Sequence, residues 1–176
     1  MANIDAPRGL TPYMGQGGTP RLKKYLNSTT TDTFRGDAVA LATNGRVHRI
    51  ATTTGSAATI GVAANFVDAS DSTSAQDVWV WDDPDQQFLI QDDGTGVTTT
   101  TVRASTGATF PYIIGAGSTV TGMSIFEMDG SATGTTSGDP LLAVGYLEGP
   151  RNEVHANATR IVTLNRHILK KGSAGI

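Results

Sequence analysis

The amino-acid sequence predicts an all-β protein with a single β-sandwich or β-barrel-like body, an extended N-terminal arm and a short basic C-terminal tail. Only 16% of the residues are charged and 21 of the 176 residues are glycine, so strong helix formers are scarce. Abundant threonine and glycine favour strands joined by tight turns. About nine short apolar runs recur along the chain with connections of about 4–12 residues, which is typical of a sandwich or barrel.

The first strand pair is predicted in residues 34–51. The run FRGDAVALA at 34–42 is followed by Thr43, Asn44 and Gly45, and then by RVHRIA at 46–51. Asn-Gly between two alternating runs is a strong hairpin signal, because both residues tolerate the positive φ angles of a tight hairpin turn. We therefore expect an antiparallel hairpin here.

Two further strands are predicted at 60–66 and at 77–83. In the second strand, Val78 and Val80 alternate with Trp79 and Trp81. Successive side chains of a strand point to opposite faces, so one face carries the valines and the other carries both tryptophans of the chain. One face should be core, and the other should form a second core or an interface.

The second half of the chain carries weaker but regular strand signals. Gly145 interrupts one apolar run and predicts a bulge or a close backbone approach. Residues 105–122 are rich in glycine and threonine, and we expect them to form a loop or an irregular strand. The predicted elements are a strand at 86–91, the irregular segment 105–122, a strand or single helical turn at 124–130, and strands at 141–149 and 159–168.

Residues 1–26 are predicted to form an extended basic arm outside the body. Three prolines and four glycines in this segment prevent a persistent helix. The segment contains four basic residues and only one acidic residue. Its apolar residues are spaced too irregularly for a helix face, so we expect them to anchor the arm in grooves of another chain. The anchors and bases are Arg8, Leu10, Tyr13, Arg21, Leu22, Lys23, Lys24 and Tyr25.

The C-terminal end repeats this charge. Arg166, Lys170 and Lys171 lie in a tail, residues 166–176, that contains no acid. The body between the two ends, residues 27–165, is acidic, because the whole chain carries a net charge of −3 while each end is basic. This asymmetry suggests docking on a surface or self-complementary contacts between copies, although terminal charges also occur on solvating tails.

Catalytic and metal-binding motifs are not recognisable. The chain has no cysteine, its three histidines are far apart, and it contains neither a Walker loop nor a nucleophile elbow. The best enzyme candidate is a group of acids that could flank a hairpin and bind a hard cation: Asp82, Asp83, Asp85, Asp92 and Asp93. Asp beside Pro or Gly is also ordinary turn chemistry, which we favour. We expect no enzymatic activity and no cofactor or metal.

Membrane and nucleic-acid functions are also disfavoured. No apolar run approaches the length of a membrane span or a signal peptide, so we expect a protein made in the cytoplasm. The acidic body and the 6% aromatic content give no readable groove for nucleic acid.

Four fragments resemble segments of a family of tailed-bacteriophage virion proteins that decorate or cement the capsid. The first two are MANIDAPRGLTP and the pair FRGDAVAL and IGVAANF; the others are VWVWDDPDQQFLIQDDG and RIVTLNRHILKKGSAGI. The resemblance covers both ends of the chain but not residues 95–140. It implies a β-rich module without enzymatic activity, bound in many symmetric copies on a shell of major capsid protein.

The residues and the resemblance lead to one expectation with two alternatives. We expect a decoration protein on the capsid surface of a virion, assembled in the host cytoplasm, that binds the major capsid protein and copies of itself. The alternatives are a tail- or fibre-associated virion protein and a metal-dependent or carbohydrate-active enzyme that uses the aspartates. The expected contact residues are the arm residues given above together with Trp79, Trp81, Arg166, Lys170 and Lys171.

Overall fold

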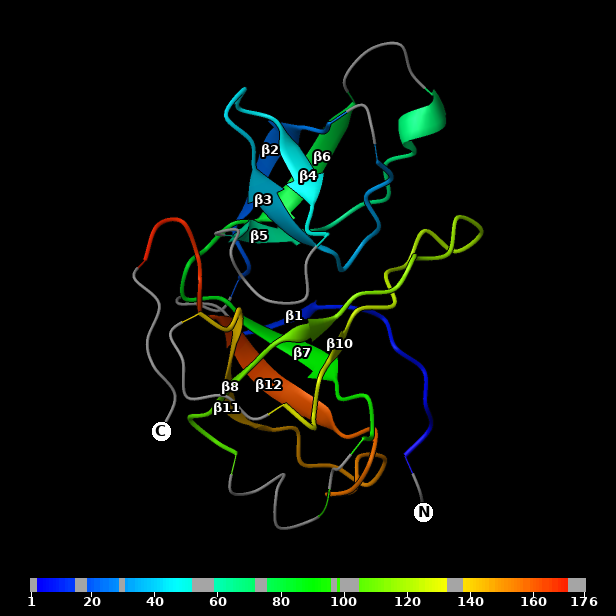
Figure 1. The fold of residues 1–176 in the computed structure, drawn as a ribbon, viewed down its shortest axis with the longest axis vertical. Helices are drawn as coiled ribbons and strands as arrows, with labels where there is room; N and C mark the ends of the chain where they lie inside the picture. Colours follow the sequence, from blue (N-terminus) through cyan, green and yellow to red (C-terminus); the bar gives the residue numbers. More distant parts are fainter. Residues whose placement is uncertain are drawn as a thin grey trace.

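A computed structural model gives the fold of the protein (Figure 1). It describes residues 3–14, 19–28, 31–51, 59–71, 76–95, 98, 105–132 and 138–170. Within these residues the chain forms twelve strands and one short 3₁₀ turn, Ala69–Asp71. Two five-stranded sheets pack together as a β-sandwich, which confirms the all-β prediction. No helix in these ranges is long and apolar enough to cross a membrane.

The lower sheet of Figure 1 is open and wholly antiparallel. Its central strands are paired along most of their length, and Gly145 marks a register shift between β11 and β12, as the sequence predicted. In spatial order its strands are β1 (Thr11–Met14), β7 (Gln87–Gln91), β12 (Thr159–Leu164), β11 (Leu141–Tyr146) and β8 (Thr109–Phe110).

The upper sheet curls so that its first and last strands meet. Its order is β2 (Leu22–Leu26), β6 (Asp77–Trp81), β5 (Thr59–Ala63), β3 (Ala38–Leu41) and β4 (Val47–Arg49). Asn27, directly after β2, forms a parallel bridge with Val47 of β4, and the Ser28 N–H donates to the Val47 carbonyl at 2.7 Å. The sheet therefore closes on itself. The predicted hairpin of β3 and β4 is confirmed.

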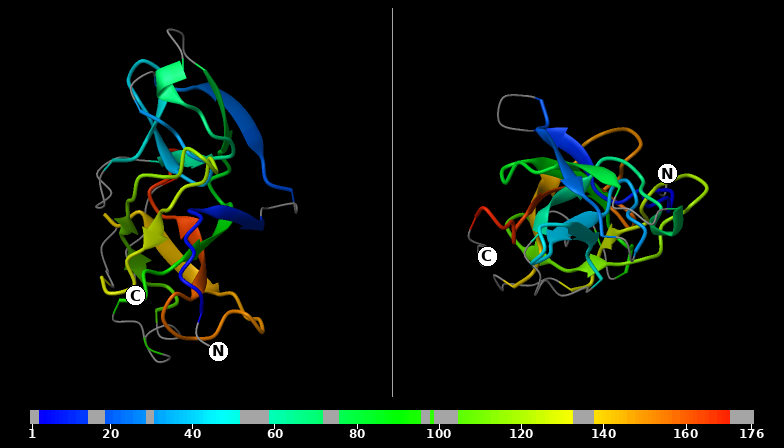
Figure 2. Two further views of the ribbon diagram at one scale, coloured as in Figure 1. Left: turned by 90° about the vertical axis from the view of Figure 1, so that its right-hand side faces the viewer. Right: turned by 90° about the horizontal axis from the view of Figure 1, so that it is seen from above.

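A two-stranded ribbon, β9 (Tyr112–Ile113) and β10 (Glu127–Met128), completes the fold. Met128 forms a bridge with Asp92, so the ribbon is joined to the end of the β7 segment. Figure 2 shows the long axis of the molecule from a second side, with the two sheets following one another along it.

The sandwich has two hydrophobic cores. The shared core lies between the sheets and includes Phe88 and Val162 from the lower sheet and Ala38 and Trp81 from the upper sheet. The inner core lies inside the curled upper sheet, where Val39, Val47, Ile60, Ala63, Val67, Val78 and Val80 pack together with Tyr25. Strands of the upper sheet contribute side chains to both cores, because alternate side chains of a strand point to opposite faces.

The N-terminal segment belongs to the body instead of standing apart from it. β1 pairs with β7 of the lower sheet and β2 pairs with β6 of the upper sheet, both antiparallel. Leu10, expected as an anchor for a neighbour, is 1% exposed in the shared core of its own chain. The described parts of the segment include two extended strands, but the open edges of its own sheets supply the partners that we had assigned to another chain.

The two tryptophans of β6 have different environments. Trp81 is buried in the shared core, beneath the second sheet as expected. Trp79 lies two residues earlier on the same face and remains 47% exposed, because the lower sheet does not extend over that end of the strand. The valine face is the inner core.

Candidate partner-binding surfaces

Two surface pockets, called hollows below, are lined by most of the residues that we expected to contact a partner. The first, here called the terminal groove, has a volume of about 550 Å³ and is lined by Arg21, Leu22, Lys23, Tyr25, Leu41, Ile60, Asp82, Ile168 and Leu169. The second, here called the inter-sheet cleft, has a volume of about 560 Å³ and is lined by Pro7, Arg8, Leu10, Thr11, Arg35, Gly36, Trp81, Thr121 and Met123.

The terminal groove carries exposed aliphatic side chains from both ends of the chain. Leu22 of β2 is 49% exposed and Leu169 is 63% exposed, while Leu41 and Ile168 are also exposed. An isolated surface leucine is ordinary, but four aliphatic side chains around one hollow form a contiguous apolar surface of the kind that marks interaction sites.

A buried histidine holds the C-terminal segment in this position. His167 is buried, and its Nδ1 accepts a hydrogen bond from the Leu169 N–H at 3.1 Å. On either side of it, the Thr59 N–H donates to the Arg166 carbonyl at 2.8 Å and the Ile168 N–H donates to the Thr59 carbonyl at 2.7 Å. Burial lowers the pKa of His167. These bonds fix the backbone, so Ile168 and Leu169 face outward beside β5.

Asp82 is the polar centre of the groove wall. Its carboxylate is nearly fully buried and accepts hydrogen bonds from Arg21 Nε at 2.7 Å and from the Tyr25 hydroxyl at 2.9 Å. Arg21 also donates to the Asp82 backbone carbonyl at 2.9 Å. Burial, followed by the hydrogen bond to Asp82, raises the pKa of Tyr25 to about 12. The network ties the start of β2 to the end of β6.

Most of the basic residues around the groove are paired within the chain. Lys24 lies 2.9 Å from Asp77, and Lys170 lies 3.9 Å from Asp85. The Lys23 ammonium lies 5.2 Å from the centre of the Tyr25 ring, in cation–π range. The two basic ends therefore meet on one side of the molecule, and acids of the same chain already neutralise part of their charge.

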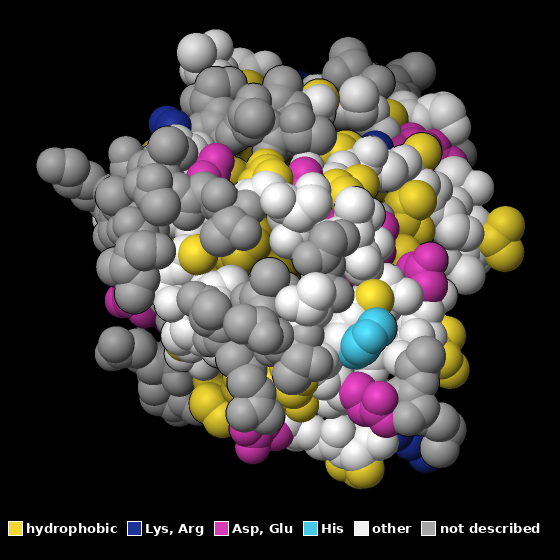
Figure 3. Space-filling view, turned by 60° about the horizontal axis from the view of Figure 1, so that its bottom comes forward, with side chains coloured by type: hydrophobic (Ala, Val, Ile, Leu, Met, Phe, Trp, Pro, Cys, Tyr) yellow, Lys and Arg dark blue, Asp and Glu magenta, His cyan; other side chains and the backbone are white. Residues whose placement is uncertain are grey.

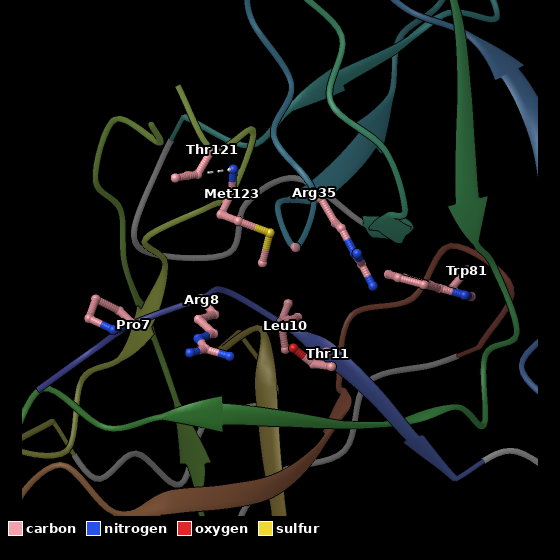
Figure 4. A pocket seen from close by; sticks show the side chains of 9 residues that line it. Pro7, Arg8, Leu10, Thr11, Arg35, Trp81, Thr121 and Met123 are labelled. Carbon is pink, nitrogen blue, oxygen red and sulfur yellow. Dashed lines mark hydrogen bonds between the residues drawn. The ribbon is translucent and has the colours of Figure 1, made fainter. Parts of the chain in front are cut away.

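The inter-sheet cleft lies where residues 7–11 cross the loop before β3 (Figure 4). The Leu10 N–H donates to the Gly36 carbonyl at 2.9 Å, and a Cβ on Gly9 would lie 2.5 Å from that same oxygen. Gly9 also has a positive φ of 65°. Only glycine allows this close crossing, which fixes Arg8 and Leu10 against the upper sheet.

The five aspartates of the sequence do not gather. β6 and β7 lie in different sheets, so they form no hairpin, and the prediction that they could bring all five acids to one edge is wrong. Asp82 is bound to Arg21, whereas Asp92, beyond the far end of β7, pairs with Arg160 at 3.1 Å, and both side chains are buried. Within the residues that the structure describes, no three acids or histidines are arranged to hold a metal ion.

The remaining candidate residues lie outside the two hollows. Tyr13 is half-buried on β1 and Trp79 is exposed on β6. Arg166 is half-buried and acts through its backbone, and Lys171 lies outside the described residues. On the face shown in Figure 3, acidic side chains are more conspicuous than basic ones.

Sequence reasoning did not identify several lining residues. Leu41, Ile168 and Arg35 belonged to predicted strands, Leu169 to the predicted tail, and Met123 lay between two predicted elements, so nothing in their local pattern set them apart. Ile168 and Leu169 lie between Arg166 and Lys170 in the sequence. This proximity to expected contact residues was the signal that could have identified them.

Comparison of this chain with protein-family models, curated proteins and solved structures finds no match.

Proposed function

We propose that this protein is a structural component of a tailed-phage virion that decorates the capsid and binds the major capsid protein in many symmetric copies. The observation that carries the proposal is the terminal groove, where the two basic ends of the chain place Leu22, Ile168 and Leu169 beside Leu41 of β3, all four exposed. The resemblance of the chain to capsid-decorating proteins at both ends supplies the class of partner.

Apolar contacts would supply most of the affinity. Full burial of a leucine or isoleucine contributes about 1.5–3 kcal/mol relative to leaving it exposed, whereas an exposed ion pair contributes about 0–1 kcal/mol. The groove has four such aliphatic side chains, and its best-placed bases, Arg21 and Lys170, are already paired in the chain. Leu22 and Leu169 are therefore the expected centres of the contact.

Charge would act mainly on the rate of encounter. Lys23 keeps its ammonium over an aromatic ring instead of on a carboxylate, so it remains able to attract an acidic shell. At about 1 M salt the Debye length falls to about 3 Å, which screens exposed charges. Association should slow at high salt, while dissociation should change less.

The proposal is tested by binding purified protein to undecorated capsids assembled from the major capsid protein of the same genome. The double variant Leu22→Ser/Leu169→Ser should bind at least about tenfold more weakly, as expected from the loss of two buried leucine side chains. Val120→Ser is the matched control, because Val120 is 94% exposed and lies outside both hollows. Sedimentation of capsids with bound protein measures the affinity, and thermal melts verify that all variants are folded.

Unchanged capsid binding by the double variant would overturn the role of the groove. No binding of the wild-type protein, with labelled protein found instead at the tail of intact virions, would overturn the capsid assignment itself. Complete release at high salt would show that electrostatic contacts hold the protein on the shell.

A further inference from the structure

We propose that the inter-sheet cleft is a second binding site, which recognises an acidic peptide segment carrying an apolar residue. This inference is independent of capsid binding, because it rests on a different hollow and can be measured on the isolated protein. Its basis is the combination of two guanidinium groups without acidic partners and an apolar wall in one cleft.

Arg8 and Arg35 are exposed and face no carboxylate. Among the described residues, no ion pair involves either guanidinium, and the lining of the cleft contains no acid. Two other arginines of the chain are paired with acids: Arg49 with Asp37 at 3.2 Å and Arg160 with Asp92 at 3.1 Å. The cleft therefore holds two positive charges in a chain whose net charge is −3.

The guanidinium group favours a carboxylate as ligand. Its planar set of N–H donors matches the two oxygens of a carboxylate and gives a bidentate pair. Arg35 comes from the upper body and Arg8 from the crossing N-terminal segment, so the two guanidinium groups line the cleft from different parts of the chain (Figure 4).

The backbone at both arginines is fixed before any ligand binds. The Arg35 N–H donates to the Gly122 carbonyl at 3.0 Å, and the Arg35 carbonyl accepts from the Ser124 N–H at 2.9 Å. Arg8 is held by the glycine crossing beside it. A site on fixed backbone loses less conformational entropy on binding than one on a free segment.

The apolar wall selects a peptide over a small inorganic anion. Met123 and the small accessible part of Trp81 line the cleft above the buried Leu10, and Arg35 extends toward the Trp81 ring in Figure 4. A free phosphate or sulfate would use only the arginines. A segment such as acid–apolar–acid would place its middle side chain against the wall and its carboxylates on Arg8 and Arg35.

Trp81 provides a direct reporter of the site. The chain has two tryptophans, so a Trp79→Phe background leaves the Trp81 signal alone. In this background we would titrate acetyl-Glu-Leu-Glu-amide and the uncharged acetyl-Gln-Leu-Gln-amide and follow Trp81 fluorescence. We expect saturable binding of the acidic peptide, at least about tenfold tighter than that of the amide peptide.

Arginine variants separate the site from general charge attraction. Arg8→Gln and Arg35→Gln should each weaken binding of the acidic peptide, and the double variant should abolish its advantage over the amide peptide. Arg151→Gln is the matched control, because Arg151 is an exposed arginine that lines a different hollow, and it should leave binding unchanged. Thermal melts of each variant confirm that the fold persists.

Equal affinity for the two peptides would overturn the proposal, and so would full binding by the double arginine variant. Displacement of the peptide by equimolar sodium sulfate would show a simple anion site and would also overturn it. None of these results bears on capsid attachment through the terminal groove, so failure of one proposal is distinguishable from failure of the other.

Discussion

The two sheets differ in how they bury their apolar residues. The upper sheet closes through the bridge of Asn27 and Val47 and encloses an inner core of its own. The lower sheet is open, and its buried residues pack in the core that it shares with the upper sheet. The upper sheet can therefore keep part of its core without its neighbour, whereas the lower sheet depends on contact between the two.

The N-terminal segment links these unequal halves. β1 extends the open lower sheet at its edge, and β2 takes part in closing the upper one. Removing residues 1–26 would thus expose the edge of β7, open the upper sheet and delete Leu10 from the shared core. The segment contributes to stability, so truncation is a poor test of partner binding, and point variants of exposed residues are better.

The largest expected effect is on the shared core. Phe88 lies on β7 with its side chain fully buried, and Phe88→Ala should lower the free energy of unfolding by about 3–5 kcal/mol. Hydrogen exchange should then show amides of β7 and β12 losing protection before those of β3, β5 and β6. Urea unfolding followed by circular dichroism gives the magnitude.

A matched pair of valines sharpens this comparison. Val162→Ala removes two methyl groups from the shared core and Val80→Ala removes two from the inner core, and both residues are fully buried. Each should cost about 2 kcal/mol. Val80→Ala should weaken protection in the upper sheet, and Val162→Ala should weaken it in the lower sheet. Identical exchange patterns in the two variants would mean that the sheets unfold as one unit.

The next effect concerns the point where β6 leaves the upper sheet. Asp82→Asn keeps the shape of the side chain but removes the charge that binds Arg21 and Tyr25, and should cost about 1–3 kcal/mol. Asp85→Asn is the control, because Asp85 is exposed and its pair with Lys170 is long at 3.9 Å, so its loss should cost under about 1 kcal/mol. Equal losses in denaturant unfolding would contradict a special role of Asp82.

The sequence was sufficient for elements whose signal is local. The hairpin at Asn44-Gly45, the bulge at Gly145 and the strand containing Val78 and Val80 follow from turn chemistry and alternation, and the structure confirms each. These features depend on residues that are neighbours in the chain.

The errors concern relations between distant segments. Proline and glycine in residues 1–26 predict extended backbone, but not that β7 and β6 offer the edges on which it pairs. Asp82 and Asp92 lie close in the sequence, which suggested that they share one acidic edge of a hairpin. The chain instead passes from the upper sheet to the lower sheet between β6 and β7, so the two aspartates are separated. Pairing across sequence distance is a tertiary property, and local pattern does not encode it.

Glu127 should contribute to the pH dependence of stability in the lower half. Burial, then the nearby Asp5, Asp93 and Asp92, raises the pKa of Glu127 to about 7. A carboxyl whose folded pKa exceeds the unfolded value of about 4.3 favours the fold when protonated, so this contribution is present below about pH 4 and is lost as the pH rises toward 7. Glu127→Gln should therefore raise the melting temperature at pH 8 but hardly at pH 4. The same increase at both pH values would exclude titration as the cause.

The smallest expected effect, on the upper half, comes from Tyr25 and appears at alkaline pH. The folded pKa of Tyr25 is raised to about 12, above the unfolded value of about 10. Its stabilising contribution is thus fully present below about pH 10 and is lost as the pH rises toward 12. Tyr25→Phe keeps the ring in the inner core but removes the hydroxyl that donates to Asp82, so the variant should lose less stability than wild type between pH 10 and pH 11.5. Melting temperatures across this range measure the difference. Parallel curves for the two proteins would mean that ionisation of Tyr25 does not contribute to the pH dependence of stability.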